Sequence, residues 1–368
     1  MFVAWRDLRH ARGRFVLIGS VVALITLLVG FLAGLTGGLA SQNVSAVLGL
    51  PGDRLVLQQP STGQPSFAQS TIDEQARVGW QDAAGVDEVV PVGIVQGRAT
   101  AGRAASAGAD TAVGVALVGL PHGSGGARGS VVADLAPRAD DQVGLSAGAA
   151  HDLGAAVGDR VTVAGSTFRV ASVGGDAWYS HTPVLALTPD AWAAADRRLG
   201  GDGAATVLAV SGTPDWSAVS ARTHTSAATP LGSLTALETF RSEVGSLGLM
   251  IAMLFGVSAL VVGAFFTVWT MQRAGDVAVL KALGASTPSL VRDALGQALV
   301  VLVAGIGVGT VAVVALGVAA GGALPFMLSP LTTLLPSVAM VLLGLAGAAV
   351  ALRTVTAADP LTALGSNR

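Results

Sequence analysis

One uncharged apolar run, Leu247–Met271, constrains the fold of this chain more than any other feature. About 20 apolar residues in a helix cross the hydrocarbon core of a bilayer. The run is therefore predicted to be a membrane-spanning helix. A charged patch, Arg273–Asp276, follows directly and marks the return of the chain to water.

Three further apolar runs predict a protein with four membrane spans. Of the 368 residues, 52% are hydrophobic and only 12% are charged, whereas a soluble globular chain carries about a quarter charged residues. The charges concentrate between Ser41 and Val244. The predicted fold class is an α-helical membrane protein with four transmembrane helices and an α+β extracellular domain inserted between helices 1 and 2. The predicted boundaries are 1–14 (cytoplasmic interfacial helix), 15–39, 246–271, 295–320 and 331–352 (the four spans), 40–245 (extracellular domain), 272–294 (cytoplasmic coupling segment) and 353–368 (cytoplasmic tail).

The inserted domain shows patterns of both strands and helices. Alternating apolar residues around a Gly-containing turn predict a β-hairpin over 158–173. Thr188 followed by Pro189 predicts the start of a helix. Strands mixed with isolated helices are typical of an α+β domain. We also expect strands at 53–57, 112–120, 183–187 and 206–210, a helix at 72–80, and a loop over 97–110.

Basic residues predict how the chain is oriented in the membrane. The two ends and the 272–294 segment carry nine basic and four acidic residues, against 12 basic and 19 acidic residues between the first two spans. Loops rich in Lys and Arg stay in the cytoplasm. We therefore expect a cell-membrane protein with both termini in the cytoplasm and the large domain outside. The first apolar run is longer than the core of a signal peptide, about 7–15 residues, and we expect it to be retained.

Two features of the N-terminal region predict surfaces of contact. Phe2, Trp5 and Leu8 share one helical face, with arginines on the other, which is typical of a helix at the lipid headgroups; simple flanking charge is the alternative. Small residues at four-residue spacing let another helix approach closely. The first span has glycines at this spacing, namely Gly30, Gly34 and Gly38. They are predicted to form an interface with a second copy of the chain. The alternative is that they only reflect a glycine-rich composition.

Several kinds of chemistry are excluded by missing motifs. The chain has no cysteine, so it has neither disulfides nor thiolate metal sites. The single lysine, Lys281, is not part of a phosphate-binding P-loop, no G-x-S-x-G sequence occurs, and the five histidines are scattered. No ionisable residue interrupts the spans, which argues against proton-coupled transport. We expect a non-catalytic subunit without an intrinsic cofactor or nucleic-acid partner, which takes its energy from another protein.

The segment after the second span predicts where that protein acts. Val277, Leu280 and Leu283 share one face of a short helix at the membrane surface. The stretch from Met271 to Ser286 resembles the motif that follows the second span in permeases of the type VII (FtsX-like, MacB-like) ABC transporters. The resemblance implies coupling to a cytoplasmic ATPase through Arg273, Asp276, Leu280, Lys281, Leu283 and Gly284. The sequence departs from the family motif where Asp276 and Gln297 replace the usual glutamates.

The beginning of the chain resembles one group of permeases within this class more specifically. Ala4–Leu8, Arg14–Ile18 and Phe31–Leu39 look like the corresponding segments of heme-efflux permeases of the HrtB type. The resemblance implies a pump of two permeases and two cytoplasmic ATPases, with heme in the membrane as substrate. Heme iron takes His, Met, Tyr or carboxylate ligands. The candidate heme-binding residues are Met250, Met253, Phe240, Arg241 and Glu243, with Tyr179 and His181 as a second possible pair; the alternative is that the two methionines only pack or face lipid.

Three other functions remain open at this point. The same architecture could export a lipoprotein, a peptide or a drug, which substrate-stimulated ATPase activity would distinguish. A regulator of the FtsX type would instead bind a cell-wall hydrolase outside and export nothing. An intramembrane enzyme is the least favoured, because no paired polar residues face each other in the spans.

Overall fold

The computed structural model describes residues 12–102, 112–124, 130–272, 275, 279, 284, 286–320 and 324–356. The chain forms two compact units. The helical unit comprises Met1–Gly38 and Gly245–Arg368, and the outer domain comprises Leu39–Val244.

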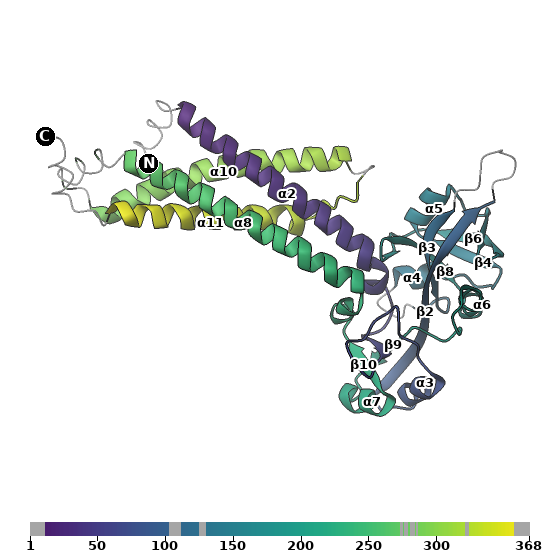
Figure 1. Cartoon of the computed structure of the whole chain (residues 1–368). Coiled ribbons are helices and arrows are strands. Elements are labelled where there is room, and N and C mark those ends of the chain that lie inside the picture. The colour runs from purple at the N-terminus through teal and green to yellow at the C-terminus, as the bar shows by residue number, and fades with distance from the viewer. Residues whose placement is uncertain are drawn as a thin grey trace. The chain divides into compact units, whose positions relative to one another are not determined.

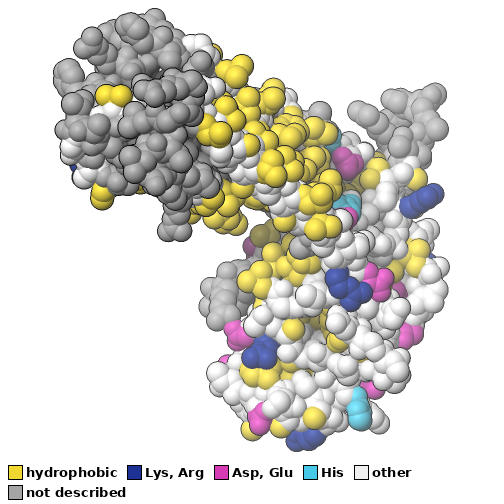
Figure 2. Space-filling view, turned by 60° about the vertical axis from the view of Figure 1, so that its left-hand side comes forward, with side chains coloured by type: hydrophobic (Ala, Val, Ile, Leu, Met, Phe, Trp, Pro, Cys, Tyr) yellow, Lys and Arg dark blue, Asp and Glu magenta, His cyan; other side chains and the backbone are white. Residues whose placement is uncertain are grey.

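Long apolar helices make up the helical unit (Figure 1). They are α2 (Arg12–Leu48), α8 (Glu238–Gln272), α10 (Thr287–Ala320) and α11 (Pro330–Thr356); α2 ends and α8 begins within the outer domain. Among the described residues, four stretches are long and apolar enough to cross a membrane, namely Val16–Leu48, Glu238–Phe265, Val291–Ala320 and Pro330–Val350. Figure 2 shows hydrophobic side chains gathered over this unit, while charged side chains lie mainly on the outer domain.

Small residues allow α2 and α10 to pack with their backbones in close contact. A Cβ atom on Gly305 would lie 2.9 Å from the carbonyl oxygen of Gly19, and one on Gly309 would lie 2.6 Å from that of Ala23. Both contacts are closer than a real Cβ atom tolerates, so glycine is needed at both positions. Helices in a bilayer pack in this way, because lipid provides no hydrophobic drive for association.

The glycines predicted to contact a second copy face residues of the same chain. Gly30 lies against Val313 of α10. Gly34 lies under the ring of Phe326, and the backbone of Pro325 covers Gly38. These glycines therefore serve close packing within the helical unit, and an interface between two copies at this position stays a prediction.

The outer domain is built around a 10-stranded sheet. The strands run in the order β10-β1-β9-β2-β3-β8-β4-β6-β5, and β7 pairs with β8. Their bounds are β1 Arg54–Gln58, β2 Val86–Ala101, β3 Val113–Gly119, β4 Gln142–Leu145, β5 Arg160–Val163, β6 Ser166–Val173, β7 Trp178–Tyr179, β8 Thr182–Leu187, β9 Val207–Gly212 and β10 Thr225–Ala228. The helices around it are α3 Glu74–Gln81, α4 Val131–Leu135, α5 Ala147–Leu153, α6 Pro189–Leu199 and α7 Trp216–Thr223, followed by the 3₁₀ helix η2 Gly232–Ala236.

The 16-residue strand β2 belongs to both halves of the outer domain. Its first half pairs with β9, next to α3 and α7, over a core that contains Trp80. Its second half pairs with β3 and also with β5, so that β2, β3, β8, β4, β6 and β5 form a closed ring of strands. A second core, which contains Leu117 and Trp192, fills this half.

The structure confirms the predicted fold class, in which four apolar helices accompany an α+β domain inserted between the first and second of them. The hairpin over 158–173 is present as β5 and β6, with Ala164 and Gly165 at positive φ in the turn. Thr188 caps α6 by accepting a hydrogen bond from the amide of Ala191.

The predicted loop over 97–110 is wrong at its start. Arg98 pairs with Gly114 and Ala99 pairs with Val163, so β2 continues to Ala101. Residues 103–111 lie outside the described residues.

Candidate functional site

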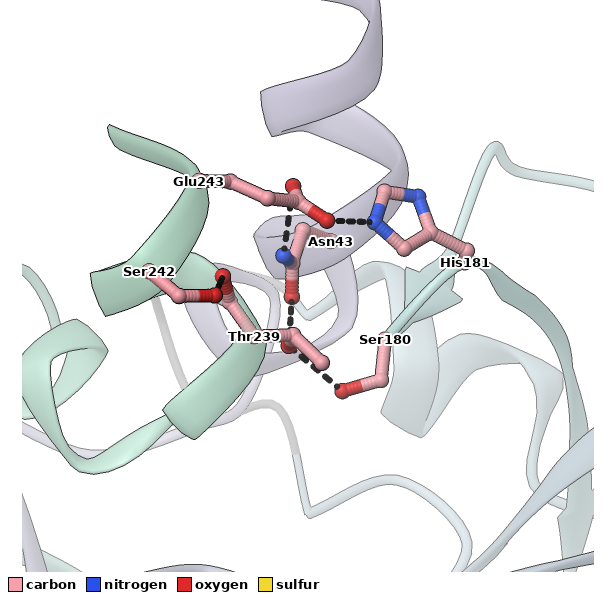
Figure 3. Close-up of polar contacts among 6 residues, drawn as sticks. All are labelled: Asn43, Ser180, His181, Thr239, Ser242 and Glu243. Atoms are coloured by element: carbon pink, nitrogen blue, oxygen red, sulfur yellow. Dashed lines mark hydrogen bonds and ion pairs between the residues drawn. The ribbon is translucent and has the colours of Figure 1, made fainter. Parts of the chain in front are cut away.

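A network of polar side chains joins α2, the β7–β8 turn and the start of α8 within the outer domain (Figure 3). At its centre is the carboxylate of Glu243. One oxygen, Oε1, lies 2.7 Å from Nε2 of His181, and the other, Oε2, accepts a hydrogen bond of 3.1 Å from Nδ2 of Asn43. Both His181 and Glu243 are about one-third exposed, so solvent reaches this pair.

Asn43 is fully buried at 0% exposure and holds the network together. Its Oδ1 accepts a hydrogen bond of 2.9 Å from Oγ1 of Thr239, which lies 3.1 Å from Oγ of Ser180. A buried amide is costly unless both its oxygen and its nitrogen are paired. Because Asn43 pairs both, it fixes the orientation of Glu243 relative to Thr239.

The β7–β8 turn places His181 beside Glu243. Ser180 and His181 both have positive φ, at 46° and 64°, as a two-residue hairpin turn of the primed type requires. Their amides donate hydrogen bonds of 3.0 Å to the carbonyl oxygens of Asn43 and Gln42 on α2. The hairpin is not evident from sequence, because Ser-His replaces the usual Asn-Gly.

Tyr179, the other member of the predicted Tyr179–His181 pair, lies inside the domain. Its ring packs edge-on against Phe67, with the ring centroids 6.4 Å apart. Burial raises the pKa of its hydroxyl well above the usual value, and nearby Glu238 acts in the same direction. The phenol therefore stays protonated at neutral pH, whereas His181 reaches the partly exposed network.

The predicted heme-binding residues fall into two groups. In the outer domain, Phe240 packs half-buried against the core, and Arg241 donates a hydrogen bond of 3.1 Å to Oε1 of Gln64. Glu243 belongs to the network described above. In the helical unit, the side chains of Met250 and Met253 on α8 are 52% and 64% exposed. Among the described residues, no group of three His, Asp or Glu side chains is arranged to hold a metal ion.

Most of the predicted coupling residues lie outside the described part of the chain. These are Arg273, Asp276, Leu280, Lys281 and Leu283. Gly284 is described and has a φ of 93°. Side chains other than glycine rarely adopt this backbone conformation, so the glycine of the motif serves a turn just before α10.

Comparison with known proteins supports the class of protein that the sequence motif indicated. Residues 248–360 match the family model of the FtsX-like permease C-terminal domain. This match supports the resemblance to permeases of type VII ABC transporters that the motif after the second span indicated. Proteins of this class lie in a membrane and work with an ATPase partner.

Relatives over the whole length of the chain include permeases named for hemin transport. The chain is 22% identical to the putative hemin transport system permease protein HrtB of Staphylococcus haemolyticus, over 99% of each chain. It is 26% identical to an uncharacterized ABC transporter permease of Mycobacterium tuberculosis, again over 99% of each chain. Among solved structures, the periplasmic region of MacB from Actinobacillus actinomycetemcomitans aligns at 11% identity and a TM-score of 0.34, covering 50% of this chain and 92% of that one.

Proposed function

We propose that this chain is the permease subunit of an ATP-driven pump that exports heme from the membrane. Relatives named for hemin transport, similar from end to end, support this proposal. The structural observation that carries it is the pair of exposed thioethers of Met250 and Met253, three residues apart on the apolar helix α8.

The two methionines suit heme for a physical reason. Heme is a flat apolar macrocycle, and the thioether of methionine is one of the side chains that ligate its iron. Residues three apart lie on the same side of a helix, so both sulfur atoms face the same surroundings. An interface with a second copy of the chain would supply a matching pair. Phe240, Arg241 and Glu243 stay predictions for the same cargo.

Heme binding can be tested on the complex of the chain with its ATPase in lipid nanodiscs. Heme titration should produce a Soret band and stimulate ATP hydrolysis. The double variant Met250→Leu and Met253→Leu should weaken heme binding at least about tenfold, because leucine keeps the apolar volume and removes the ligand atoms. Met271→Leu is the matched control, since Met271 lies on the same helix and its side chain is 64% exposed.

Two outcomes would contradict the heme assignment. The first is a complex that neither binds heme nor hydrolyses ATP faster in its presence. The second is an equal loss of heme binding in Met271→Leu. If a lipoprotein, peptide or drug stimulated ATP hydrolysis instead of heme, the chain would still be a pump subunit, but its cargo would be that molecule.

We further propose that two ATPases drive the pump by pressing on the segment between Arg273 and Gly284. The variant Leu280→Asp plus Leu283→Asp should lose the ATPase on co-purification, because it places charges on the apolar face of the predicted helix. The variant Val279→Asp, beside that face, is the control and should retain the ATPase. Unchanged binding and activity in the double variant would remove this segment from the coupling mechanism.

A further inference from the structure

A polar pocket opens between α3 and α7 in the half of the outer domain that contains β1, β9 and β10. Its volume is about 390 Å³, within the range of about 300–1,000 Å³ that is usual for ligand sites. The loop before α3, the end of β1 and the end of α7 contribute its walls. None of these residues belongs to the network around Glu243.

The floor of the pocket consists of buried apolar residues and of polar groups that already make hydrogen bonds. Ile72 and Ala76 are buried, and Gly79 allows the side chain of Thr223 to lie against α3. Below them, Nε1 of Trp80 donates a hydrogen bond of 3.0 Å to Oγ1 of Thr225, which lies 2.8 Å from Oγ1 of Thr223. Hydrogen bonding to a ligand is therefore left to the rim.

The rim carries opposite charges on its two walls. The carboxylates of Asp73 and Asp82 stand on the α3 side, and the guanidinium of Arg222 stands on the α7 side. Oδ1 of Asp73 caps α3 by accepting from the amide of Ala76 at 2.7 Å. Among the described residues, neither Asp82 nor Arg222 makes a side-chain hydrogen bond or an ion pair.

Three glutamines complete the rim: Gln58, Gln59 and Gln75. A glutamine amide both donates and accepts hydrogen bonds, as a peptide group does. The rim thus offers carboxylates on one wall, a guanidinium on the other, and groups that pair with a peptide backbone between them.

We propose that this pocket binds a short peptide that carries both a basic and an acidic group. The basic group would pair with Asp82, and the acidic group with Arg222. Charge-assisted hydrogen bonds are the stronger kind, and a guanidinium holds a carboxylate with two parallel bonds. Because the two walls are not paired with each other, such a ligand satisfies both at once.

The proposal can be tested with fluorescently labelled tetrapeptides of neutral, basic, acidic and mixed charge. Binding to the full chain with its ATPase in nanodiscs would be followed by fluorescence polarisation. We expect the mixed-charge peptide to bind at least about tenfold more tightly than the neutral one. Equal affinities across the four peptides would overturn the proposal, as would tighter binding of a neutral oligosaccharide than of any peptide.

Single substitutions test the contribution of each charged wall of the pocket separately. Arg222→Gln should abolish the preference for the acidic group, and Asp82→Asn should abolish the preference for the basic group, each leaving the other preference in place. Arg169→Gln, which changes an exposed arginine of β6 outside the pocket, should bind all peptides as the parent chain does. An equal loss in Arg169→Gln, or unchanged selectivity in Arg222→Gln, would contradict the assignment, and unchanged melting temperatures would show that the variants fold.

Discussion

Asn43 is the residue on which the polar network depends. Its amide joins Glu243 to Thr239, and no solvent reaches it. A leucine of similar size would fill the same space and leave both partners without their hydrogen bond. The lost hydrogen bond to the carboxylate of Glu243 is worth about 1.5–3 kcal/mol, and the one to the neutral, exposed Thr239 about 0.5–1.5 kcal/mol.

We therefore expect Asn43→Leu to lower the free energy of unfolding by about 2–5 kcal/mol, given two affected partners. The measurement is denaturant unfolding of the chain in detergent, followed by tryptophan fluorescence. Ser217→Ala is the control, because it removes an exposed hydrogen bond to Asp215. A change in Asn43→Leu no larger than in the control would show that the amide does not stabilise the network.

Gln297 shows what a single departure from the family motif means. The side chain is only 2% exposed, and its Nε2 donates a hydrogen bond of 3.2 Å to Oδ2 of Asp293, one turn earlier on α10. A glutamate there would place two carboxylates side by side, and like charges at this spacing repel each other. The glutamine thus fits the aspartate that this chain carries.

Among the elements, α7 depends on its N-cap residue, Asp215, which directly precedes the helix. Asp215 accepts hydrogen bonds from the amide of Ala218 and the hydroxyl of Ser217, which together hold its pKa below the usual value. A carboxyl whose pKa is lowered in the folded state stabilises that state above its unfolded pKa, and this stabilisation is lost as the pH falls through the folded pKa.

We expect the amides of α7 to exchange hydrogen faster, relative to the intrinsic rate, as the pH falls from neutral to below about 4, the usual pKa of aspartate. The measurement is hydrogen exchange followed by mass spectrometry. Asp215→Asn should remove the pH dependence, because asparagine caps helices equally well and does not titrate. Protection of α7 that is the same at both pH values in the parent chain would rule out this role for the carboxylate.

Elements with strong local signals were predictable, and those set by distant contacts were not. The hairpin of β5 and β6 has a Gly-containing turn between alternating apolar residues, and α6 begins at a Thr-Pro pair. In β2, by contrast, Gly97 suggested a loop. The structure shows that it is a strand residue paired with Val115, where a Cβ atom would lie only 3.3 Å from Leu199 of α6.

At the scale of the whole molecule, the pairings in the candidate site could not be predicted from the sequence either. The sequence singled out Glu243 together with its near neighbours Phe240 and Arg241. The structure pairs Glu243 with His181, 62 residues away, and with Asn43, 200 residues away. Such pairings depend on how the strands and the two long helices meet, and local patterns do not contain that information.

Orientation in the membrane can be tested on the whole chain, because it contains no cysteine. Single substitutions therefore give unambiguous labelling by a maleimide that does not cross membranes. Asp202→Cys, in an exposed loop of the outer domain, should be labelled in intact cells. Ser286→Cys, exposed before α10, should be labelled only after the cells are made permeable. The reverse pattern would invert the predicted topology and place the coupling segment out of reach of an ATPase.

The shared strand β2 has a consequence for how the outer domain tolerates change. Side chains alternate between the two faces of a strand, so an insertion or deletion of one residue within β2 turns every later side chain to the opposite face. Since β2 lines the cores of both halves of the outer domain, a shift that begins in one half would misplace side chains in the other half as well. Length variation should be tolerated in surface connections, while this strand keeps a constant number of residues.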